Sequence, residues 1–373
     1  MTPESEEELS AVLAERRDPV LIRGGGTRGI GMEASVLETG RLSGIELYEP
    51  GALTLVAGAG TPLAEIEKAL ADGNQRLAFE PMDHRGLLGS EGEPTIGGIV
   101  AANISGPRRI QVGACRDHLL GVRFVDGSGS IIKNGGRVMK NVTGYDLVKL
   151  MAGSWGTLGV LSQVSLKVLP ESETEATLLL PCPDVATAIS RMSAALGSPF
   201  EVTGAACAPR EGTLTVMLRL EGFEESVAYR AQRLADQLGD VSLVSDRDES
   251  RRIWREIRDV SAFHGTTGDV WRISVKPGDA AEVSSRLEAE ALSFDWGGGL
   301  IWALVGEGSD LRQRIGPISG HATLVRAPTD TRTRFGMFQP EPAPLVAISA
   351  GLRERFDPRG ILNPGLMKTP AHA

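Results

Sequence analysis

Apolar residues along the chain follow two spacings, and each spacing predicts a different kind of element. From residue 3 to about residue 17 they share one face of a helix, with Thr2 as the expected N-cap. Residues 62–71 repeat the helical spacing behind Thr61. Short apolar runs predict strands at residues 20–22, 36–39, 45–47, 53–57 and 161–168, and a hairpin around the turn 126–129. The first 80 residues are therefore expected to form a small α/β lobe.

The pattern changes in the second half of the chain. Between residue 171 and about residue 330, strand-like and helical segments alternate, and glycine-rich loops become sparse. This predicts a separate α+β domain with an antiparallel sheet covered by helices on one face. Residues 328–345 have the Pro, Thr and Arg content of a linker, and a last helix is expected over 345–356. The predicted domains are 1–170 (lobes 1–80 and 81–170), 171–330 and 331–373.

A glycine-rich loop at residues 23–31 follows the strand expected at 20–22. Glycine lets the backbone approach a ligand closely, so such a loop can point several N–H groups at one phosphate. Gly24, Gly26 and Gly29 match the G-x-G-x-x-G spacing, but a Rossmann site needs a helix that begins inside the motif. The next helix is expected only at residue 62. Two interpretations follow: a pyrophosphate loop that is not of the Rossmann type, or a glycine-rich surface turn.

Composition excludes several function classes. The 373 residues include 46 glycines and carry a net charge of −9. An acidic chain without a basic stripe is a poor binder of nucleic acid. The three cysteines form no C-x-x-C pair, so this chain alone is not expected to hold an iron–sulfur or zinc site. The N-terminal residues do not have a signal-peptide pattern, and no apolar run has the length of a membrane span.

Several motifs together resemble a known family. They are residues 95–98, Asn103, Gly106, and residues 126–127, 144–147 and 156–159. This set resembles the FAD-binding domain of the vanillyl-alcohol oxidase type, also called PCMH-type, and residues 19–27 resemble its first pyrophosphate loop. Residues 355–365 resemble the closing segment of FAD-linked 2-hydroxy-acid dehydrogenases. Residues 138–146 and 152–159 extend the likeness to the FAD-binding E subunits of bacterial glycolate oxidases.

The resemblance implies an α+β fold: a two-lobed PCMH-type FAD-binding domain, an α+β cap domain, and a C-terminal segment that returns to the first domain. Loop N–H groups would bind the FAD pyrophosphate, and later motifs would line its ribityl and adenosine parts. Asn363, in the closing segment, would lie near the flavin. The implied cofactor-binding residues are Gly24, Gly25, Gly26, Thr27, Thr95, Gly97, Gly98, Asn103, Gly106, Gly156, Thr157, Gly159, Val160 and Asn363.

Two departures from the family pattern change the expectations. Relatives that bind flavin covalently often carry a histidine in the first loop; residues 23–31 contain none, so non-covalent FAD is expected. The dehydrogenase subunits usually have Gly-Ser-Glu-Gly-Thr, where Trp155 here replaces the Glu, and a paired-histidine pattern that can hold a metal. The five histidines of this chain form no such pattern, so no metal site is expected.

His321 and Arg326 are the candidate catalytic residues, because they share the strand-like run 319–326. His321 would act as a general base or hydrogen-bond donor near the flavin, and Arg326 would bind a carboxylate bidentately. The alternative is a strand-edge histidine beside a solvated arginine. His264, in a glycine-containing loop, leaves the same choice.

Four other residues allow a functional and a structural interpretation. For Tyr145, a hydroxyl that holds the loop is favoured over an acid. Trp155 would either stack near the cofactor or anchor a core or a partner. Arg108 and Arg109 would either reach a phosphate or form a solvated loop edge.

These features favour a flavoprotein subunit of a 2-hydroxy-acid oxidoreductase, with glycolate oxidase as the leading expectation. The resemblance implies a second FAD-linked oxidase subunit and an iron–sulfur subunit as partners, with a quinone as acceptor. The missing histidine pattern makes the sister subunit the better candidate for oxidising the acid. The alternatives are an assembly subunit without turnover and a stand-alone FAD-dependent oxidoreductase. The expected location is the cytoplasm, with membrane attachment only peripheral, at the inner membrane, and through partners.

Overall fold

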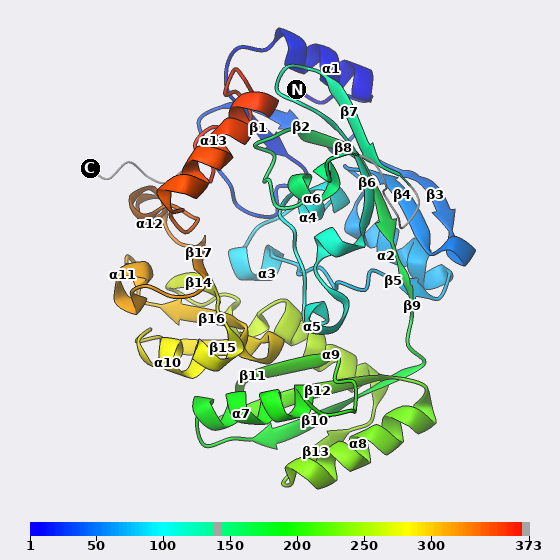
Figure 1. The fold of residues 1–373 in the computed structure, drawn as a ribbon, viewed down its shortest axis with the longest axis vertical. Helices are drawn as coiled ribbons and strands as arrows, with labels where there is room; N and C mark the ends of the chain where they lie inside the picture. Colours follow the sequence, from blue (N-terminus) through cyan, green and yellow to red (C-terminus); the bar gives the residue numbers. More distant parts are fainter. Residues whose placement is uncertain (137–143, 368–373) are drawn as a thin grey trace. The chain divides into compact units, whose positions relative to one another are not determined.

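A computed structural model describes residues 1–136 and 144–367, and these form two compact units (Figure 1). Unit 1 consists of Met1–Ser105, Gly113–Glu171 and Glu341–Met367, and unit 2 of Gly106–Val112 and Ser172–Pro340. The sequence pattern puts residues 106–112 in the first domain, whereas the structure groups them with unit 2. Residues 138–143, which carry part of the family resemblance, lie outside the described residues.

Unit 1 is built on a five-stranded antiparallel sheet. Its strands follow the order β3 (Ile45–Glu49), β4 (Thr54–Gly58), β8 (Val160–Lys167), β6 (Leu119–Val125) and β7 (Ile131–Gly135). β6 and β7 pair directly, which confirms the hairpin around residues 126–129. The helices α2 (Leu63–Asp72), α4 (Ile96–Ala101) and α6 (Leu147–Met151) bury their apolar side chains in one core with this sheet. Each large side chain buried there stabilises the unit by about 1.5–3 kcal/mol.

A parallel pairing in unit 1 joins the two ends of the chain. β1 (Val20–Arg23) pairs with β2 (Ser35–Glu38), and Leu362 of the closing segment bridges Val20. α1 (Glu6–Glu15) buries its apolar face against this group. Unit 1 also contains β5 (Gln75–Arg76) paired with β9 (Leu169–Pro170), α3 (Arg85–Leu88) and α13 (Ala343–Phe356).

Two predicted helix starts are wrong. α1 begins at Glu6 because Ser5, and not Thr2, caps it: the Ser5 Oγ accepts a hydrogen bond from Glu8 N at 3.1 Å. α2 begins at Leu63 because Thr61 does not cap it: its hydroxyl donates to the Gly58 carbonyl at 2.7 Å.

Unit 2 contains an eight-stranded sheet in which every pairing is antiparallel. The strand order is β13 (Ser242–Val244), β10 (Thr174–Pro181), β12 (Thr213–Gly222), β11 (Gly204–Arg210), β15 (Ala291–Asp295), β16 (Leu300–Val305), β14 (Asp269–Ser274) and β17 (His321–Arg326). Its helices are α5 (Arg109–Val112), α7 (Val185–Leu196), α8 (Glu224–Leu238), α9 (Arg247–Arg258), α10 (Ala280–Ser285), α11 (Leu311–Ile315) and α12 (Thr329–Phe335).

Helices cover both faces of this sheet rather than the single face expected. Successive side chains of a strand point to opposite faces, and β11 shows the division. Ala205 and Cys207 join the core formed with α7, α8 and α10. Ala206 and Ala208 join a second core with Trp254 of α9. The sequence pattern hides this because β11 consists mostly of small residues, which give no alternation of apolar and polar positions.

The structure also differs from the elements expected from sequence at two other places in the chain. Residues 328–345 are not a simple linker, because α12 occupies Thr329–Phe335 and α13 begins at Ala343. The apolar pattern over residues 279–292 resolves into the short helix α10 followed by strand β15. β15 forms because it can pair with β16 on one side and with β11 on the other.

Candidate functional site

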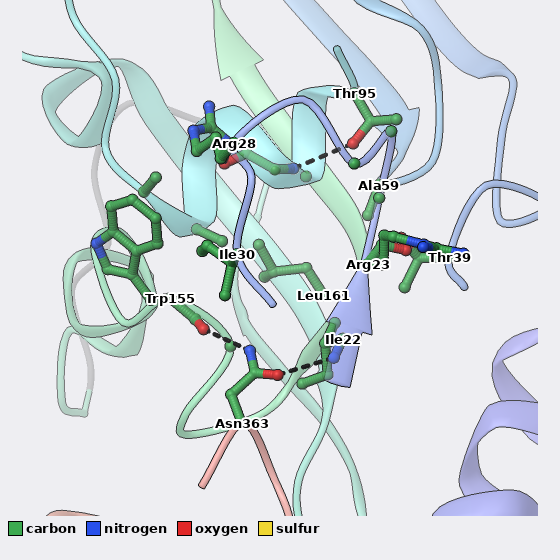
Figure 2. A pocket seen from close by; sticks show the side chains of 18 of the residues that line it. Ile22, Arg23, Arg28, Ile30, Thr39, Ala59, Thr95, Trp155, Leu161 and Asn363 are labelled. Carbon is green, nitrogen blue, oxygen red and sulfur yellow. Dashed lines mark hydrogen bonds between the residues drawn. The ribbon is translucent and has the colours of Figure 1, made fainter. Parts of the chain in front are cut away.

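An open pocket in unit 1 lies where the loop after β1, the start of α4 and the turn before β8 meet (Figure 2). Its lining includes backbone from the glycine loop and apolar side chains from three segments. The residues that line it are Leu21, Ile22, Arg23, Gly24, Gly25, Gly26, Thr27, Arg28, Gly29, Ile30, Thr39, Ala59, Thr95, Gly97, Gly98, Ala101, Ala102, Trp155, Gly156, Gly159, Val160, Leu161 and Asn363.

The glycine loop packs directly against residues 93–95. A Cβ atom on Gly25 would lie 1.6 Å from the Glu93 carbonyl oxygen, and one on Gly24 would lie 2.4 Å from Thr95 Oγ1. Gly26 has a φ of +70°, a backbone conformation that favours glycine. Steric contact and backbone conformation therefore both require glycine here, and the result is a loop held flat against α4.

This loop presents backbone donors that the protein does not use. Within the described residues, the N–H groups of Gly25, Gly26, Thr27 and Arg28 donate to no protein atom. The Thr27 carbonyl, in contrast, accepts a hydrogen bond from Ser90 Oγ at 2.8 Å, which fixes the loop. Successive unpaired N–H groups form a concave anion-binding surface. The loop can therefore hold a phosphate group without rearranging its own hydrogen bonds.

Arg28 places a cation in the same pocket. Its Nη1 donates to the Gly98 carbonyl at 2.8 Å, and its guanidinium carbon lies 6.0 Å from the centre of a Trp155 ring. Its Nε is buried and has no hydrogen-bond partner among the described residues. Burial lowers the pKa of Arg28 to about 10, so the side chain stays positively charged at neutral pH. An anionic cofactor would supply the missing acceptor and the compensating charge.

Asn363 joins three segments at the edge of the pocket (Figure 2). Its Oδ1 accepts a hydrogen bond from Ile22 N at 2.8 Å, and its Nδ2 donates to the Trp155 carbonyl at 2.8 Å. Its own backbone N–H donates to the Val20 carbonyl at 3.0 Å. The side chain is buried, so these groups would be costly to leave unpaired. Asn363 thus holds β1 and the Trp155 turn in place.

The structure brings most of the expected cofactor residues together and leaves three outside the pocket lining. Gly24, Gly25, Gly26, Thr27, Thr95, Gly97, Gly98, Gly156, Gly159, Val160 and Asn363 line it. The Asn103 side chain instead accepts a hydrogen bond from Arg116 N at 3.0 Å, and the Thr157 hydroxyl donates to the Ser154 carbonyl at 2.7 Å. Gly106 belongs to unit 2, where its carbonyl accepts a hydrogen bond from Trp296 Nε1 at 3.0 Å.

The two candidate catalytic residues occupy opposite ends of β17 and do not converge. Arg326 donates to the carbonyls of Phe263 at 2.8 Å and Gly268 at 3.3 Å, and to Thr266 Oγ1 at 2.8 Å. Its guanidinium thus holds a loop of unit 2. In that loop the His264 Nε2 lies 2.8 Å from the Asp259 carbonyl oxygen, a contact that fixes the ring. His321 is exposed to solvent as a residue, although neighbouring protein groups partly desolvate its imidazole and lower its pKa.

The exposure and contacts of individual side chains decide three other interpretations that the sequence left open. The Tyr145 side chain is 87% exposed, and the loop is held instead by Asn134 Nδ2, which donates to the Tyr145 backbone carbonyl at 3.0 Å. Arg108 is buried in an ion pair with Glu221 rather than solvated. Trp155 lines the pocket beside Arg28. Arg28 is the only basic residue between Gly24 and Gly31, but it is not among the site residues expected from the sequence.

Among the described residues, no helix is long and apolar enough to cross a membrane. Across residues 1–136 and 144–367, no group of three or more His, Cys, Asp or Glu side chains is placed to hold a metal ion.

Comparisons with known proteins give the site its context. Residues 1–135 match the family described as "FAD binding domain". Over 366 residues, 97% of this chain and 95% of the relative, the chain is 34% identical to glycolate oxidase subunit GlcE of Escherichia coli (strain K12). It is 29% identical over 276 residues to a D-lactate dehydrogenase of Archaeoglobus fulgidus, covering 67% of this chain and 60% of that protein. Glycolate oxidase subunit GlcD of Bacillus subtilis (strain 168) is 32% identical over 187 residues, 48% and 38% of the two chains.

A solved structure of alkyldihydroxyacetonephosphate synthase shares the fold. Its TM-score is 0.70 at 16% identity, with 98% of this chain and 77% of that chain covered. Together with the match to the FAD-binding family, this confirms the predicted fold class. The family match and the relatives also show FAD as the cofactor of this chain.

Replacing Arg28 tests the role of the pocket cation. Arg28→Gln removes the charge and is expected to weaken FAD binding by about ten-fold or more, the effect of losing a hydrogen bond to a charged group. Fluorescence titration of the flavin-free protein with FAD measures the affinity. Arg355→Gln, which removes an exposed arginine of unit 1, is the matched control and should leave the affinity unchanged. Equal affinities of both variants and the parent would exclude this role.

Replacing Asn363 tests the clamp. Asn363→Ala leaves the Ile22 N–H and the Trp155 carbonyl unpaired, so we expect a loss of about 2 kcal/mol in the free energy of unfolding. Urea unfolding followed by circular dichroism measures it. Asn363→Asp keeps the acceptor for Ile22 and tolerates the positive φ of this residue, but places a carboxylate against the Trp155 carbonyl. Unchanged stability in both variants would contradict the clamp.

Proposed function

The chain belongs to the family of glycolate oxidase subunit GlcE, and we propose that it serves as the FAD-binding subunit of an oxidase complex for glycolate or a related 2-hydroxy acid. The observation that carries the proposal is the anion cradle of residues 25–28, inside the segment that matches the FAD-binding family. The 34% identity that extends over nearly the whole length of both chains supports the assignment to this subunit rather than to the FAD-binding fold in general.

In this proposal, different parts of the pocket hold different parts of the FAD molecule. The N–H groups of Gly25, Gly26 and Thr27, with the charge of Arg28, hold the pyrophosphate. Thr95, Gly97 and Gly98 would hold the ribityl side of FAD, and Gly156, Gly159 and Val160 would hold its adenosine or ribityl region. Ile22, Ile30 and Leu161 add apolar surface that excludes water.

Bound FAD would supply a group that can accept electrons and pass them on within the complex. The protein's own contribution is to hold the cofactor and fix its surroundings. The Asn363 amide keeps the Trp155 turn against β1, so the two sides of the pocket keep their spacing. Of the two candidate catalytic residues, we still propose a hydrogen-bonding role for His321 in unit 2. Arg326 instead supports the 263–268 loop.

The proposed complex contains a second FAD-linked subunit of the GlcD type and an iron–sulfur subunit that passes electrons to a quinone. In this arrangement the second flavoprotein oxidises glycolate to glyoxylate. The names of the GlcE and GlcD relatives support a multi-subunit oxidase. We place the complex in the cytoplasm, with peripheral attachment to the inner membrane through its partners.

A reconstitution experiment tests the proposal. The purified chain should carry FAD, seen as its visible absorbance, and glycolate should not bleach that absorbance when the chain is alone. Glycolate should reduce a dye acceptor only when the GlcD-type and iron–sulfur subunits are added. A chain purified without flavin, or partners that are equally active when this chain is left out, would overturn the proposal. Bleaching of the isolated chain by glycolate would favour a stand-alone enzyme.

The flavin is expected to be bound to this chain without a covalent bond. No His, Cys or Tyr is among the described residues that line the pocket, so the side chains that usually bond to flavin are not supplied there. Heat denaturation in acid should therefore release the yellow colour completely into the supernatant. Flavin that stays with the precipitated protein, and that migrates with it on a denaturing gel, would contradict this.

A further inference from the structure

A second group of cationic and aromatic side chains lies within unit 2. It includes residues of β14 and β17, which are neighbouring strands at one edge of the sheet (Figure 1). Successive side chains of these strands point to opposite faces. Four of them enter the core formed with α7 and α10: Trp271, Ile273, Ala322 and Leu324. Arg272 and His321 therefore project from the opposite face of the sheet.

The strand register places Arg272 and His321 close together. Ser274 lies opposite His321, and Arg272 lies opposite Thr323. Arg272 and His321 are thus diagonal neighbours on one face, about 7–8 Å apart at their Cα atoms. Desolvation, and then the positive charges of Arg272 and Arg109, hold the pKa of His321 below its ordinary value.

Trp296 forms the centre of this group. The guanidinium carbons of Arg109 and Arg272 lie 4.5 Å and 5.1 Å from the centre of its ring. Its indole N–H donates to the Gly106 carbonyl at 3.0 Å, and its backbone N–H donates to Asp295 Oδ1 at 2.7 Å. The φ of Trp296 is +55°, an uncommon conformation for a bulky residue, which this surrounding structure enforces. The ring is therefore held in one position beside two cations.

The guanidinium of Arg272 is not committed to a protein acceptor. Within the described part of the chain it makes no hydrogen bond, although it is partly buried. Burial, and then the charge of Arg109, lower the pKa of Arg272 to about 10, while Asp295 acts in the opposite direction as the smallest of the three influences. Arg312 shows the contrast, since its guanidinium donates to the carbonyls of Ala322, Phe335 and Met337. Arg272 is thus a desolvated cation whose donors are left for another molecule.

We propose that Arg272 and Arg109, which flank the Trp296 ring, together with His321 beside Arg272 on the same face of the sheet, bind the carboxylate group of a small organic acid. The planar fork of a guanidinium matches the two oxygens of a carboxylate. The adjacent indole ring offers an apolar surface for a short carbon chain. The residues differ from the candidate pair expected from sequence, because the arginines that approach His321 are Arg272 and Arg109, and Arg326 is occupied elsewhere. The choice of glycolate as a probe rests on the proposed function; the geometry requires only a carboxylate.

Calorimetric titration of the full, flavin-loaded chain with glycolate and with oxalate tests the site. We expect saturable binding that Arg272→Met weakens by about ten-fold or more, since charge-assisted hydrogen bonds are lost. Arg233→Met removes an exposed arginine of the same unit and should leave binding unchanged. Acid binding of equal strength in the parent and in Arg272→Met would overturn the proposal, as would no binding by the parent.

Two further measurements separate the other outcomes. Inorganic phosphate and chloride are titrated in parallel, and binding of phosphate as strong as that of oxalate would overturn the carboxylate assignment. Without acid, Arg272→Met should melt at or above the temperature of the parent, because an uncompensated, partly buried charge is removed. Arg272→Lys keeps the charge without the fork and serves if the Met variant does not fold. Flavin absorbance is recorded throughout: loss of flavin contradicts the proposed function alone, and loss of acid binding with normal flavin contradicts this inference alone.

Discussion

The side-chain amide of Asn363 is the interaction on which the pocket depends. It connects β1, the Trp155 turn and the closing segment, which are far apart in the sequence. An amide suits this position because it both donates and accepts, whereas a carboxylate can only accept and an alkyl group can do neither. Without this connection, the strand that carries the glycine loop would lose its fixed position relative to the other wall of the pocket. Asn363 therefore acts on the cofactor by fixing the protein around it.

The glycine loop illustrates how packing and binding can require the same residue. Gly24 and Gly25 are needed because Thr95 and Glu93 leave no room for a side chain. Where the loop packs against residues 93–95, the N–H groups of residues 25–28 have no acceptor among the described residues. The close fit of the loop thus leaves donors that an anionic ligand could satisfy. Arg28 adds the charge that favours an anion over water.

Sequence could predict the parts of this protein that rest on local chemistry. The glycine loop, the hairpin of β6 and β7 and most helices have patterns that local physics explains. It could not predict β11, whose small residues become a strand only because β12 and β15 pair with it. The sequence also does not reveal that the two asparagines have different roles. The Asn103 amide holds a backbone turn, whereas Asn363 lines the pocket. The roles of Arg28 and Arg272 could not be predicted from sequence. The role of an arginine depends on which hydrogen-bond acceptors surround its guanidinium, and those acceptors come from distant segments of the chain.

The pairing of Val20 with Leu362 sets an order of events during synthesis. Val20 is made well before its partner Leu362, because more than three hundred residues separate them in the sequence (362 − 20 = 342). At about 5–20 residues per second, a ribosome needs some tens of seconds to make the intervening chain. During that time β1 has β2 beside it but not the strand that completes its other edge, and the Trp155 turn has no clamp. A nascent chain that has not reached Asn363 therefore cannot assemble the finished pocket, and cofactor loading has to wait until this segment has been made.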